Sequence, residues 1–448
     1  MRSVYVENLG CSKNQVDAEV MLACLSDEFT LTEEAGEADL ILVNSCGFIQ
    51  SAREESVAAF FALHDANPTA KIILSGCMAE RYRDELASEL TEASAIFGNR
   101  DLSKIREVAA RVFAGERIIS TPAYGDVAND VYERNELFSY PGSAYLKISE
   151  GCNHRCSYCA IPLIRGGLRS RPMDRILTEA KSLVQSGVRE INLIAQDLAA
   201  YGTDLEGRKS RFMELLTALV ALEGDFRIRL LYIHPDAFPP ELPAFIKRNP
   251  KVLPYFDIPF QHANTAILRS MGRVGTKESH LALIASIRAE IPSAVLRSTI
   301  LLGYPGEDAA SFAEVIDFLK RAELDWVGSF VYSREEGTRA AGLRGEAEHN
   351  KATVEAKRRQ KALEKVQRPI TEARLARFIA AEMDVLIEEP IEGEELAIGR
   401  SWAQAPEVDG LIVVMGRGLK AGSVVRCGIR RVNGLDLEAI VIEGGTDA

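Results

Sequence analysis

The sequence of 448 residues lacks any apolar run near the roughly 18 residues that a membrane-spanning helix needs. Its first residues, MRSVYVENLG, are typical of a strand and lack the apolar core and cleavage site of a secretory signal. Basic residues are outnumbered, since 53 Lys and Arg stand against 65 Asp and Glu, for a net charge of −12. These shortages exclude a membrane span, favour the cytoplasm, and argue against non-specific binding of nucleic acid.

The chain is too long for one ordinary core, so we expect two or three domains. It contains eight cysteines and no sign of secretion, and in a reducing compartment clustered cysteines favour metal or redox chemistry over disulfides. The eight are Cys11, Cys24, Cys46, Cys77, Cys152, Cys156, Cys159 and Cys427.

The first hundred residues alternate strand and helix patterns, which predicts a doubly wound parallel sheet. The segments SVYVENLGC, ADLILVNSCG and AKIILSGC deliver Cys11, Cys46 and Cys77 at or near three strand ends. Ligands bind at the carboxyl edge of such a sheet, so the three cysteines are candidates for one site. The alternative is that each small thiol packs at a strand end, an interpretation we keep for Cys24 and Cys427.

The pattern resumes near residue 143 with six strand-like segments: AYLKIS, EINLIA, RIRLLYI, YFDIP, VLRSTILLG and WVGSFVYS. Helical segments separate most of them, which predicts a partial (βα)6 barrel with its functional residues at the strand C-termini. After a charged helical stretch from Gly342 to Phe378, five short strands predict a small antiparallel β-barrel of the OB type, TRAM-like. The predicted domains are residues 1–117, 138–377 and 378–448, with a linker at 118–137.

The segment GCNHRCSYC, after the first barrel strand, places Cys152, Cys156 and Cys159 close together without a fourth cysteine. A structural zinc ion needs four ligands, and His154 could complete such a site. A four-iron cluster held by three thiolates instead leaves one iron open to another ligand. Both interpretations stay open at this level, and the position at a barrel strand favours the cluster.

This motif on a six-unit barrel resembles the radical S-adenosylmethionine (SAM) superfamily. The resemblance implies a 4Fe–4S cluster whose open iron binds SAM, and a radical that abstracts hydrogen from the substrate. Over nearly the whole chain the sequence resembles the methylthiotransferases, through SEGCNHRCSYCAIPLIRGGLRSRP and through LLGYPGE, where Tyr304 replaces the usual Phe. That resemblance implies an enzyme with a second 4Fe–4S cluster on Cys11, Cys46 and Cys77. It also implies two partners: a sulfur donor, and a reductant protein such as flavodoxin or ferredoxin.

The segments YFDIPFQHAN, WVGSFVYSREEGTRA and GRSWAQAPEVDG resemble the RimO branch of that family. The resemblance implies methylthiolation of an aspartate β-carbon in small-subunit ribosomal protein S-twelve. Charge agrees, since residues 380–448 hold six Lys and Arg and thirteen Asp and Glu, giving 6 − 13 = −7, which suits a basic protein better than RNA. The alternatives are a tRNA adenosine methylthiotransferase and, from another class, a non-catalytic zinc-bearing assembly protein.

Several other residues are weaker candidates. Gln196, Asp197, Arg297 and Gly303 are predicted to line the SAM pocket because they follow or belong to barrel strands. Three arginines near the motif could brace its loop or bind the SAM carboxylate, or could simply be solvated: Arg165, Arg169 and Arg171. Two histidines that follow strands fit a structural role and a pocket role equally: His234 and His262. Gln404 stands where the family resemblance leads us to expect Asp, so it is given no role.

Overall fold

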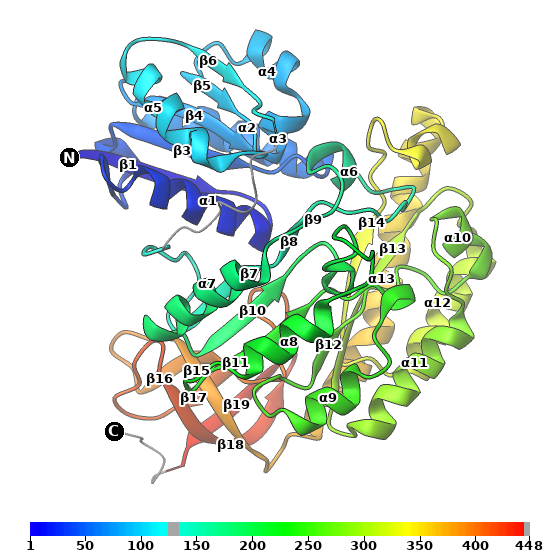
Figure 1. The fold of residues 1–448 in the computed structure, drawn as a ribbon. Coiled ribbons are helices and arrows are strands. Elements are labelled where there is room, and N and C mark those ends of the chain that lie inside the picture. Colours follow the sequence, from blue (N-terminus) through cyan, green and yellow to red (C-terminus); the bar gives the residue numbers. More distant parts are fainter. Residues whose placement is uncertain (124–133, 443–448) are drawn as a thin grey trace. The chain divides into compact units, whose positions relative to one another are not determined.

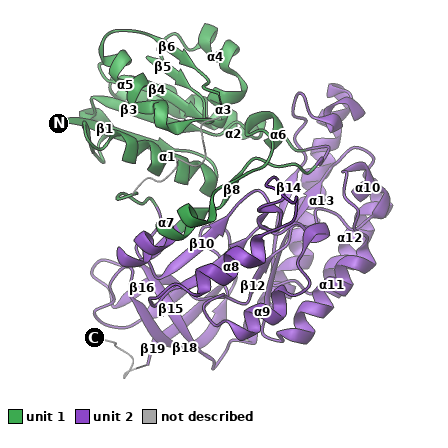
Figure 2. Cartoon of the chain, viewed as in Figure 1, with its two compact units in different colours: residues 1–138, 145–154, 159–179 green, residues 139–144, 155–158, 180–448 purple. Residues whose placement is uncertain are grey.

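The computed structural model describes residues 1–123 and 134–442. The chain forms two compact units (Figure 2). The first contains residues 1–138, 145–154 and 159–179, and the second contains residues 139–144, 155–158 and 180–448. Within the described residues, no helix combines the length and the apolar character that crossing a membrane requires.

The first unit is built on a six-stranded parallel sheet with the order β2-β1-β3-β4-β5-β6 (Figure 1). β1 pairs with both β2 and β3, so the winding direction reverses at β1 and the predicted doubly wound topology is confirmed. The strands are β1 (Arg2–Asn8), β2 (Phe29–Leu31), β3 (Leu40–Ser45), β4 (Lys71–Gly76), β5 (Ala95–Phe97) and β6 (Ile118–Ser120).

Helices cover both faces of this sheet. In β3, Leu40 and Leu42 pack on one side with α1 (Ser12–Leu25) and α5 (Ile105–Phe113). Ile41 and Val43 pack on the other side with α2 (Gln50–Ala66), α3 (Cys77–Arg81) and α4 (Arg83–Glu89). Successive side chains of a strand point to opposite faces, so a strand buried on both sides is apolar at every one of these positions.

The sequence prediction missed the short strands β2, β5 and β6 and the helix α5. The linker predicted at residues 118–137 therefore starts too early, because Ile118–Ser120 pairs with β5 as the edge strand of the sheet. Three-residue strands carry too few positions for an alternating pattern to stand out. Residues 124–133 of the predicted linker lie outside the described residues.

The six barrel strands are all present. They form the sheets β11-β10-β7 and β12-β13-β14. Two backbone hydrogen bonds join β11 to the segment just before β12: the Ile228 amide donates to the Lys251 carbonyl, and the Leu253 amide donates to the Ile228 carbonyl. The result is an open, partial parallel barrel, as predicted. The strands are β7 (Ser143–Lys147), β10 (Glu190–Ile194), β11 (Arg227–Leu231), β12 (Tyr255–Asp257), β13 (Val295–Leu302) and β14 (Trp326–Val331). The helices between them are α7 (Met173–Gln185), α8 (Phe212–Val220), α9 (Leu242–Arg248), α10 (Thr265–Ser270), α11 (Lys277–Glu290) and α12 (Ala309–Ala322).

After the long helix α13 (Glu346–Ala376), the chain closes a five-stranded barrel with the order β15-β16-β17-β19-β18. Its strands are β15 (Glu382–Pro390), β16 (Leu396–Arg400), β17 (Ile412–Met415), β18 (Val424–Asn433) and β19 (Asp436–Val441). The predicted small OB-like barrel is confirmed, and its strand pairs are antiparallel except for β17 and β19, which run parallel. Strands that alternate in direction around a ring with an odd number of members must leave one parallel pair.

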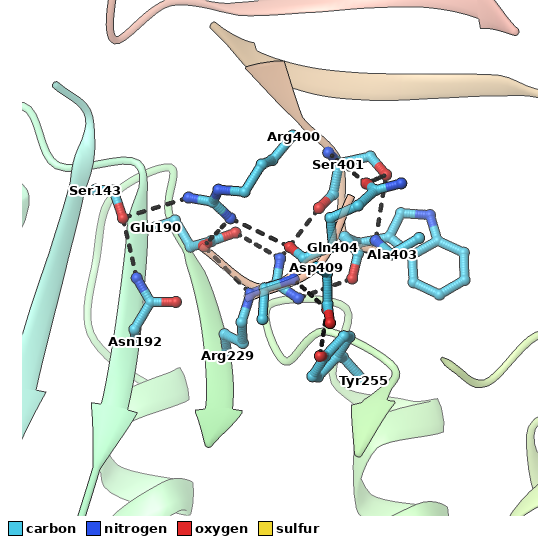
Figure 3. Close-up of polar contacts among 12 residues, drawn as sticks. Ser143, Glu190, Asn192, Arg229, Tyr255, Arg400, Ser401, Ala403, Gln404 and Asp409 are labelled. Carbon is cyan, nitrogen blue, oxygen red and sulfur yellow. Dashed lines mark hydrogen bonds and ion pairs between the residues drawn. The ribbon is translucent and has the colours of Figure 1, made fainter. Parts of the chain in front are cut away.

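A buried polar network joins this small barrel to the strands of the central one (Figure 3). The Arg400 guanidinium contacts Glu190 at 2.6 Å and Glu388 at 2.5 Å, and Arg229 contacts Glu190 at 2.9 Å. Burial alone would raise the pKa of Glu190, but Arg229 and Arg400 outweigh it and hold the pKa at about 2. The Gln404 side chain accepts hydrogen bonds from Ser401, so this residue has a structural role that the sequence did not suggest.

Candidate functional site

Three cysteine-bearing loops meet at the carboxyl edge of the first sheet. Cys11 directly precedes α1, Cys46 follows β3, and Cys77 is the first residue of α3 after β4. A Cβ on Gly10 would lie 3.1 Å from the Cβ of Cys46, and one on Gly47 would lie 2.7 Å from the backbone of Cys77. The structure thus brings together the three cysteines that the strand pattern had grouped.

The three thiols influence one another. Burial raises the pKa of Cys77 to about 12, with Arg165 opposing the rise and Cys11 and Cys46 adding to it. Burial also raises the pKa of Cys46. A thiolate is the form that binds a metal, so these thiols need a cation beside them, from the protein or from a cluster, to lose their protons.

Arg165 is the protein's own cation at this edge. Its Nη2 donates to the Cys77 Sγ at 3.3 Å and to the Asp17 carboxylate at 2.8 Å, and its Nη1 donates to Glu150 at 2.6 Å. Burial alone would lower the pKa of Arg165, but Asp17 and Cys77 outweigh it and raise the pKa, so the guanidinium stays charged. The solvated-loop interpretation of Arg165 is therefore wrong, because only 2% of its side chain is exposed.

Lys147 adds a second buried cation, which contacts Asp17 and lies 3.1 Å from Glu150. The same network thus touches helix α1, which begins just after Cys11, and Glu150, which lies two residues before Cys152. The other two arginines are used locally. Arg169 donates to the Arg165 carbonyl at 3.0 Å, and Arg171 donates to the Lys147 carbonyl at 2.6 Å.

The loop that carries Cys152 is closed on itself within the first unit. The Cys152 amide donates to the Gly166 carbonyl at 3.1 Å. A Cβ on Gly151 would lie 2.2 Å from the Gly167 carbonyl oxygen, so only glycine permits this approach. The His154 backbone amide donates to the Cys152 Sγ at 3.4 Å, and such a donor stabilises a thiolate.

The segment that carries Cys156 is held by the second unit. The Ser157 amide donates to the Met271 carbonyl at 2.9 Å, and the Ser157 hydroxyl lies 2.7 Å from the hydroxyl of Tyr304. Tyr304 also donates to the Ser270 carbonyl at 2.8 Å, which gives a use for the hydroxyl that Phe would lack. Arg273, buried and close enough to Cys156 to feel its charge, was not singled out from the sequence because nothing in its local pattern separates it from a solvated arginine.

The predicted SAM-pocket residues are only partly brought to the strand ends. Gln196 and Asp197 follow β10, and the Asp197 carboxylate accepts hydrogen bonds from the amides of Ala199 and His234. Gly303 follows β13, and a Cβ there would lie 2.6 Å from that of Ala356, so this turn allows α13 to pack closely.

The two strand-end histidines each accept a local backbone hydrogen bond. The Nδ1 of His234 accepts from the amide of Asp236 at 3.3 Å, and that of His262 accepts from the amide of Asn264 at 2.9 Å. The Nε2 of His262 lies 3.4 Å from the Glu307 carboxylate. Both histidines thus make the hydrogen bonds expected of a structural role, which was one of the two roles that the sequence allowed.

The prediction for Arg297 is wrong. Arg297 is the third residue of the eight-residue strand β13, and so lies toward the strand's amino end. Its guanidinium contacts Asp257 at 3.2 Å and Asp409, in the loop of the small barrel, at 3.3 Å. The sequence showed that Arg297 belongs to a strand, but a pocket residue must also stand at the strand's carboxyl end.

The chain is similar over nearly its full length to curated relatives. The "Ribosomal protein uS12 methylthiotransferase RimO" of Treponema denticola is 42% identical, covering 97% of this chain and 99% of that protein. The RimO of Moorella thermoacetica is 41% identical, covering 95% of this chain and 96% of that protein. The chain belongs to the RimO family. The cysteines of the GCNHRCSYC motif and the three strand-end cysteines are therefore the candidate cluster ligands of this chain.

Family profiles divide this RimO-family chain into three matches. Residues 3–98 match the "Uncharacterized protein family UPF0004", residues 146–319 match the radical SAM superfamily, and residues 379–442 match the TRAM domain. A solved structure, the radical S-adenosylmethionine methyltransferase TsrM from Kitasatospora setae, shares the fold with a TM-score of 0.54. That match covers 73% of each chain at 14% identity.

Proposed function

We propose that this chain is a radical SAM methylthiotransferase that replaces one hydrogen on the β-carbon of an aspartate in ribosomal protein uS12 with a methylthio group. The observation that carries the proposal is the near-full-length similarity to RimO proteins, 42% identical over 97% of this chain. The acidic small barrel supports a basic protein as the substrate, and supports it over the tRNA that the alternative would need. The reaction is proposed to take place in the cytoplasm, where uS12 and its ribosomal subunit are found.

We assign one 4Fe–4S cluster to Cys152, Cys156 and Cys159 and a second to Cys11, Cys46 and Cys77. The donor sets fit, since each offers three thiols. Within residues 1–123 and 134–442, no three His, Cys, Asp or Glu side chains gather closely enough to hold a single metal ion. A four-iron cluster takes each thiolate on a different iron and needs no such convergence, whereas a zinc ion does.

When bound, these groups with SAM supply the radical that removes the substrate hydrogen and the sulfur that replaces it. The chain's own residues support the cysteines: Arg165 places positive charge beside Cys77, Lys147 contacts the same Asp17 carboxylate as Arg165, and the His154 amide donates to Cys152. In the balance we propose, the methyl group would come from one SAM. The substrate hydrogen would leave with a second SAM as methionine and 5′-deoxyadenosine, after one electron from a reductant protein such as flavodoxin or ferredoxin. Joining the substrate carbon to the methylated sulfur would return one electron to the enzyme, and a sulfur donor would restore the sulfur.

Mass spectrometry tests the substrate. Reconstituted enzyme is incubated with SAM and a reductant, and with either uS12 or tRNA, and each product is weighed. We expect a gain of about 46 Da, a methylthio group in place of hydrogen, on uS12 and none on tRNA. A Cys152→Ala variant is the control that should leave both unchanged. A gain on tRNA alone would overturn the proposal in favour of the tRNA-modifying branch.

A further inference from the structure

A basic face on helix α13 has no role in the chemistry proposed above. Residues 351–368 contain seven Lys and Arg and two Glu, so this stretch carries 7 − 2 = +5 in a chain of −12. Six of its cations are exposed, one of them Lys351 near the start of the stretch. The other five fall on one side of the helix and are here called the basic stripe: Lys357, Arg358, Lys361, Lys365 and Arg368. The rest of the chain holds 53 − 7 = 46 Lys and Arg against 65 − 2 = 63 Asp and Glu, a net charge of −17, so this stretch differs in sign from the remainder.

The opposite face of α13 is fully used. Ala356, Leu363 and Gln367 are buried there. The Gln360 amide donates to the Ser329 carbonyl of β14 at 2.8 Å, and Gln367 donates to the Leu324 carbonyl at 2.9 Å. The helix therefore lies along β14 through this face.

The lysines of the stripe are not neutralised by the protein. Among the described residues, Lys357, Lys361 and Lys365 make no ion pair, whereas Arg358 and Arg368 pair with Glu355 and Glu372 at 3.5 and 3.1 Å. The three lysines recur every four residues, which spaces them about 6 Å apart along the axis. A row of uncompensated charges at regular spacing suits a polyanion with regularly spaced charges of its own.

Part of the stripe also borders a hollow. Lys361, Lys365 and Arg368 line a cavity of about 730 Å³ together with Gly328 of β14 and Gly410 of the small barrel. The acidic groups there are mostly committed: the Asp409 carboxylate contacts Tyr255 and Arg297, and Asp436 accepts a hydrogen bond from the Leu411 amide. Glu364 remains as the acid that faces the three cations.

The stripe connects two functional regions of the second unit. At one end, Ala356 of α13 packs against the Gly303 turn, at the carboxyl end of β13. At the other end, α13 leads into the small barrel, where Phe378 stacks edge-on against Trp402 with ring centroids 5.6 Å apart. A substrate that reaches from the strand ends to the small barrel would therefore pass along this helix.

We propose that the basic stripe binds the phosphate backbone of ribosomal RNA, so that the enzyme recognises uS12 within the assembled small subunit. The inference rests on the proposed function, because uS12 brings RNA phosphates beside the enzyme only in that assembly. Lys357, Lys361 and Lys365 each neutralise phosphate charge, and counterion release from the RNA supplies the binding free energy.

The test compares two substrates and two triple variants of the full chain. Lys357→Gln/Lys361→Gln/Lys365→Gln removes the charge, and Lys104→Gln/Lys181→Gln/Lys209→Gln removes three exposed lysines elsewhere as the matched control. Binding to purified small subunits and to isolated uS12 is measured at several salt concentrations. We expect the stripe variant to bind subunits about tenfold or more weakly, with the slope of log K against log[salt] reduced by about 2 to 3. Binding and methylthiolation of isolated uS12 should not change.

The outcomes separate the two proposals. Unchanged subunit binding and salt slope in the stripe variant would overturn the RNA contact and leave the stripe a solvated face. An equal loss on isolated uS12 would also overturn it, and would make the stripe a protein-binding surface. A Lys→Arg triple variant keeps the charge and should bind subunits as the wild type does. If wild-type enzyme binds subunits through the stripe yet never methylthiolates uS12, the proposed function fails while the RNA contact stands.

Discussion

At the scale of single residues, Arg165 binds several different partners within the first unit. It spans Cys77, Asp17 and Glu150, which belong to three separate segments of the chain. Planar guanidinium geometry allows one side chain to serve all three, whereas a lysine would offer only a point charge. The residue therefore joins the loops that carry the two sets of cysteines as well as supplying charge.

We expect Arg165→Gln to lower the iron content of the anaerobically reconstituted protein from about eight to about four atoms, because Cys77 loses the cation that favours its thiolate. The variant also leaves the buried Asp17 and the half-buried Glu150 short of a partner, which costs about 3 kcal/mol of folding free energy. Iron analysis and electron paramagnetic resonance measure the first effect. Arg169→Gln, which removes donors to backbone carbonyls near the same loop, is the control and should keep its iron. Full iron in Arg165→Gln would contradict the assigned role.

His280 gives the fold a predictable sensitivity to acid. Its ring stacks on Phe260 with centroids 4.5 Å apart, and burial lowers the pKa of His280 to about 4, with Asp236 opposing and Arg273 assisting. The unfolded chain binds this proton at pH values below about 6.5, so stability is fully present above that pH and is lost as pH falls toward 4. The histidine's share of the loss between pH 7.5 and 5.0 is about 1–2 kcal/mol.

Urea unfolding at these two pH values checks the prediction. His280→Leu replaces the titrating ring with an apolar side chain, so its stability should fall less between pH 7.5 and 5.0 than that of the wild type. The half-buried His64 provides the control, since His64→Leu should leave the wild-type pH dependence in place. Equal losses in His280→Leu and wild type would show that His280 does not carry the effect.

At the scale of elements, the junction between β10, β11 and the small barrel depends on buried charges that satisfy one another. Arg400 and Arg229 together face Glu190, and the Arg229 guanidinium also donates to the Ser401 and Trp402 carbonyls. Buried pairs of this kind add little over apolar packing while both partners are present, but losing one partner leaves an uncompensated charge. The network therefore favours one particular pairing of residues at the junction more than it adds to the stability of the junction.

Arg400→Met should destabilise this junction by about 3–5 kcal/mol, because Glu190 and Glu388 would remain buried without it. The two tryptophans, Trp326 and Trp402, both lie here, and Trp326 donates its indole N–H to the Ala403 carbonyl at 2.9 Å. Intrinsic fluorescence during urea unfolding therefore reports on the junction directly. Arg211→Met, which removes an exposed ion pair with Glu214, should change the curve little. A small effect for both variants would mean that the network adds no stability.

At the scale of the whole molecule, the two sets of cysteines should be separable. Cys11→Ser/Cys46→Ser/Cys77→Ser should keep about four iron atoms and still form 5′-deoxyadenosine from SAM, since the second set is intact. It should no longer methylthiolate uS12. Cys24→Ala, which changes a buried cysteine in the core of the first unit, should keep about eight irons. Loss of all iron from the triple variant would contradict two independent clusters.

Much of this molecule could be predicted from the sequence. The long strands β1, β3, β4 and β13 have patterns strong enough to find, and the carboxyl ends of the first three located Cys11, Cys46 and Cys77. The short edge strands were missed because three residues hold no period. Arg297 was assigned to the pocket because a sequence pattern shows that a residue belongs to a strand, but not where along the barrel axis the residue lies.

Contacts between distant segments left no local signal. The bond from Arg165 to Asp17 joins residues 148 positions apart, and no spacing rule connects them. The hydroxyl of Tyr304 is similar: the sequence showed that it departs from the usual Phe, but only the fold shows that it reaches Ser157. Such partners are chosen by tertiary packing, which a single sequence does not display.

The parallel pairing of β17 with β19 has a consequence for how the small barrel comes apart. Every strand in it has two neighbours, so there is no outer member from which unzipping could begin. Separating any two neighbouring strands exposes two unpaired strand edges at once. Partial opening is therefore costly, and the barrel is expected to unfold as a whole. Amide hydrogens of β17 and β15 should accordingly exchange with solvent water at a common, slow rate, as members of a single cooperative unit.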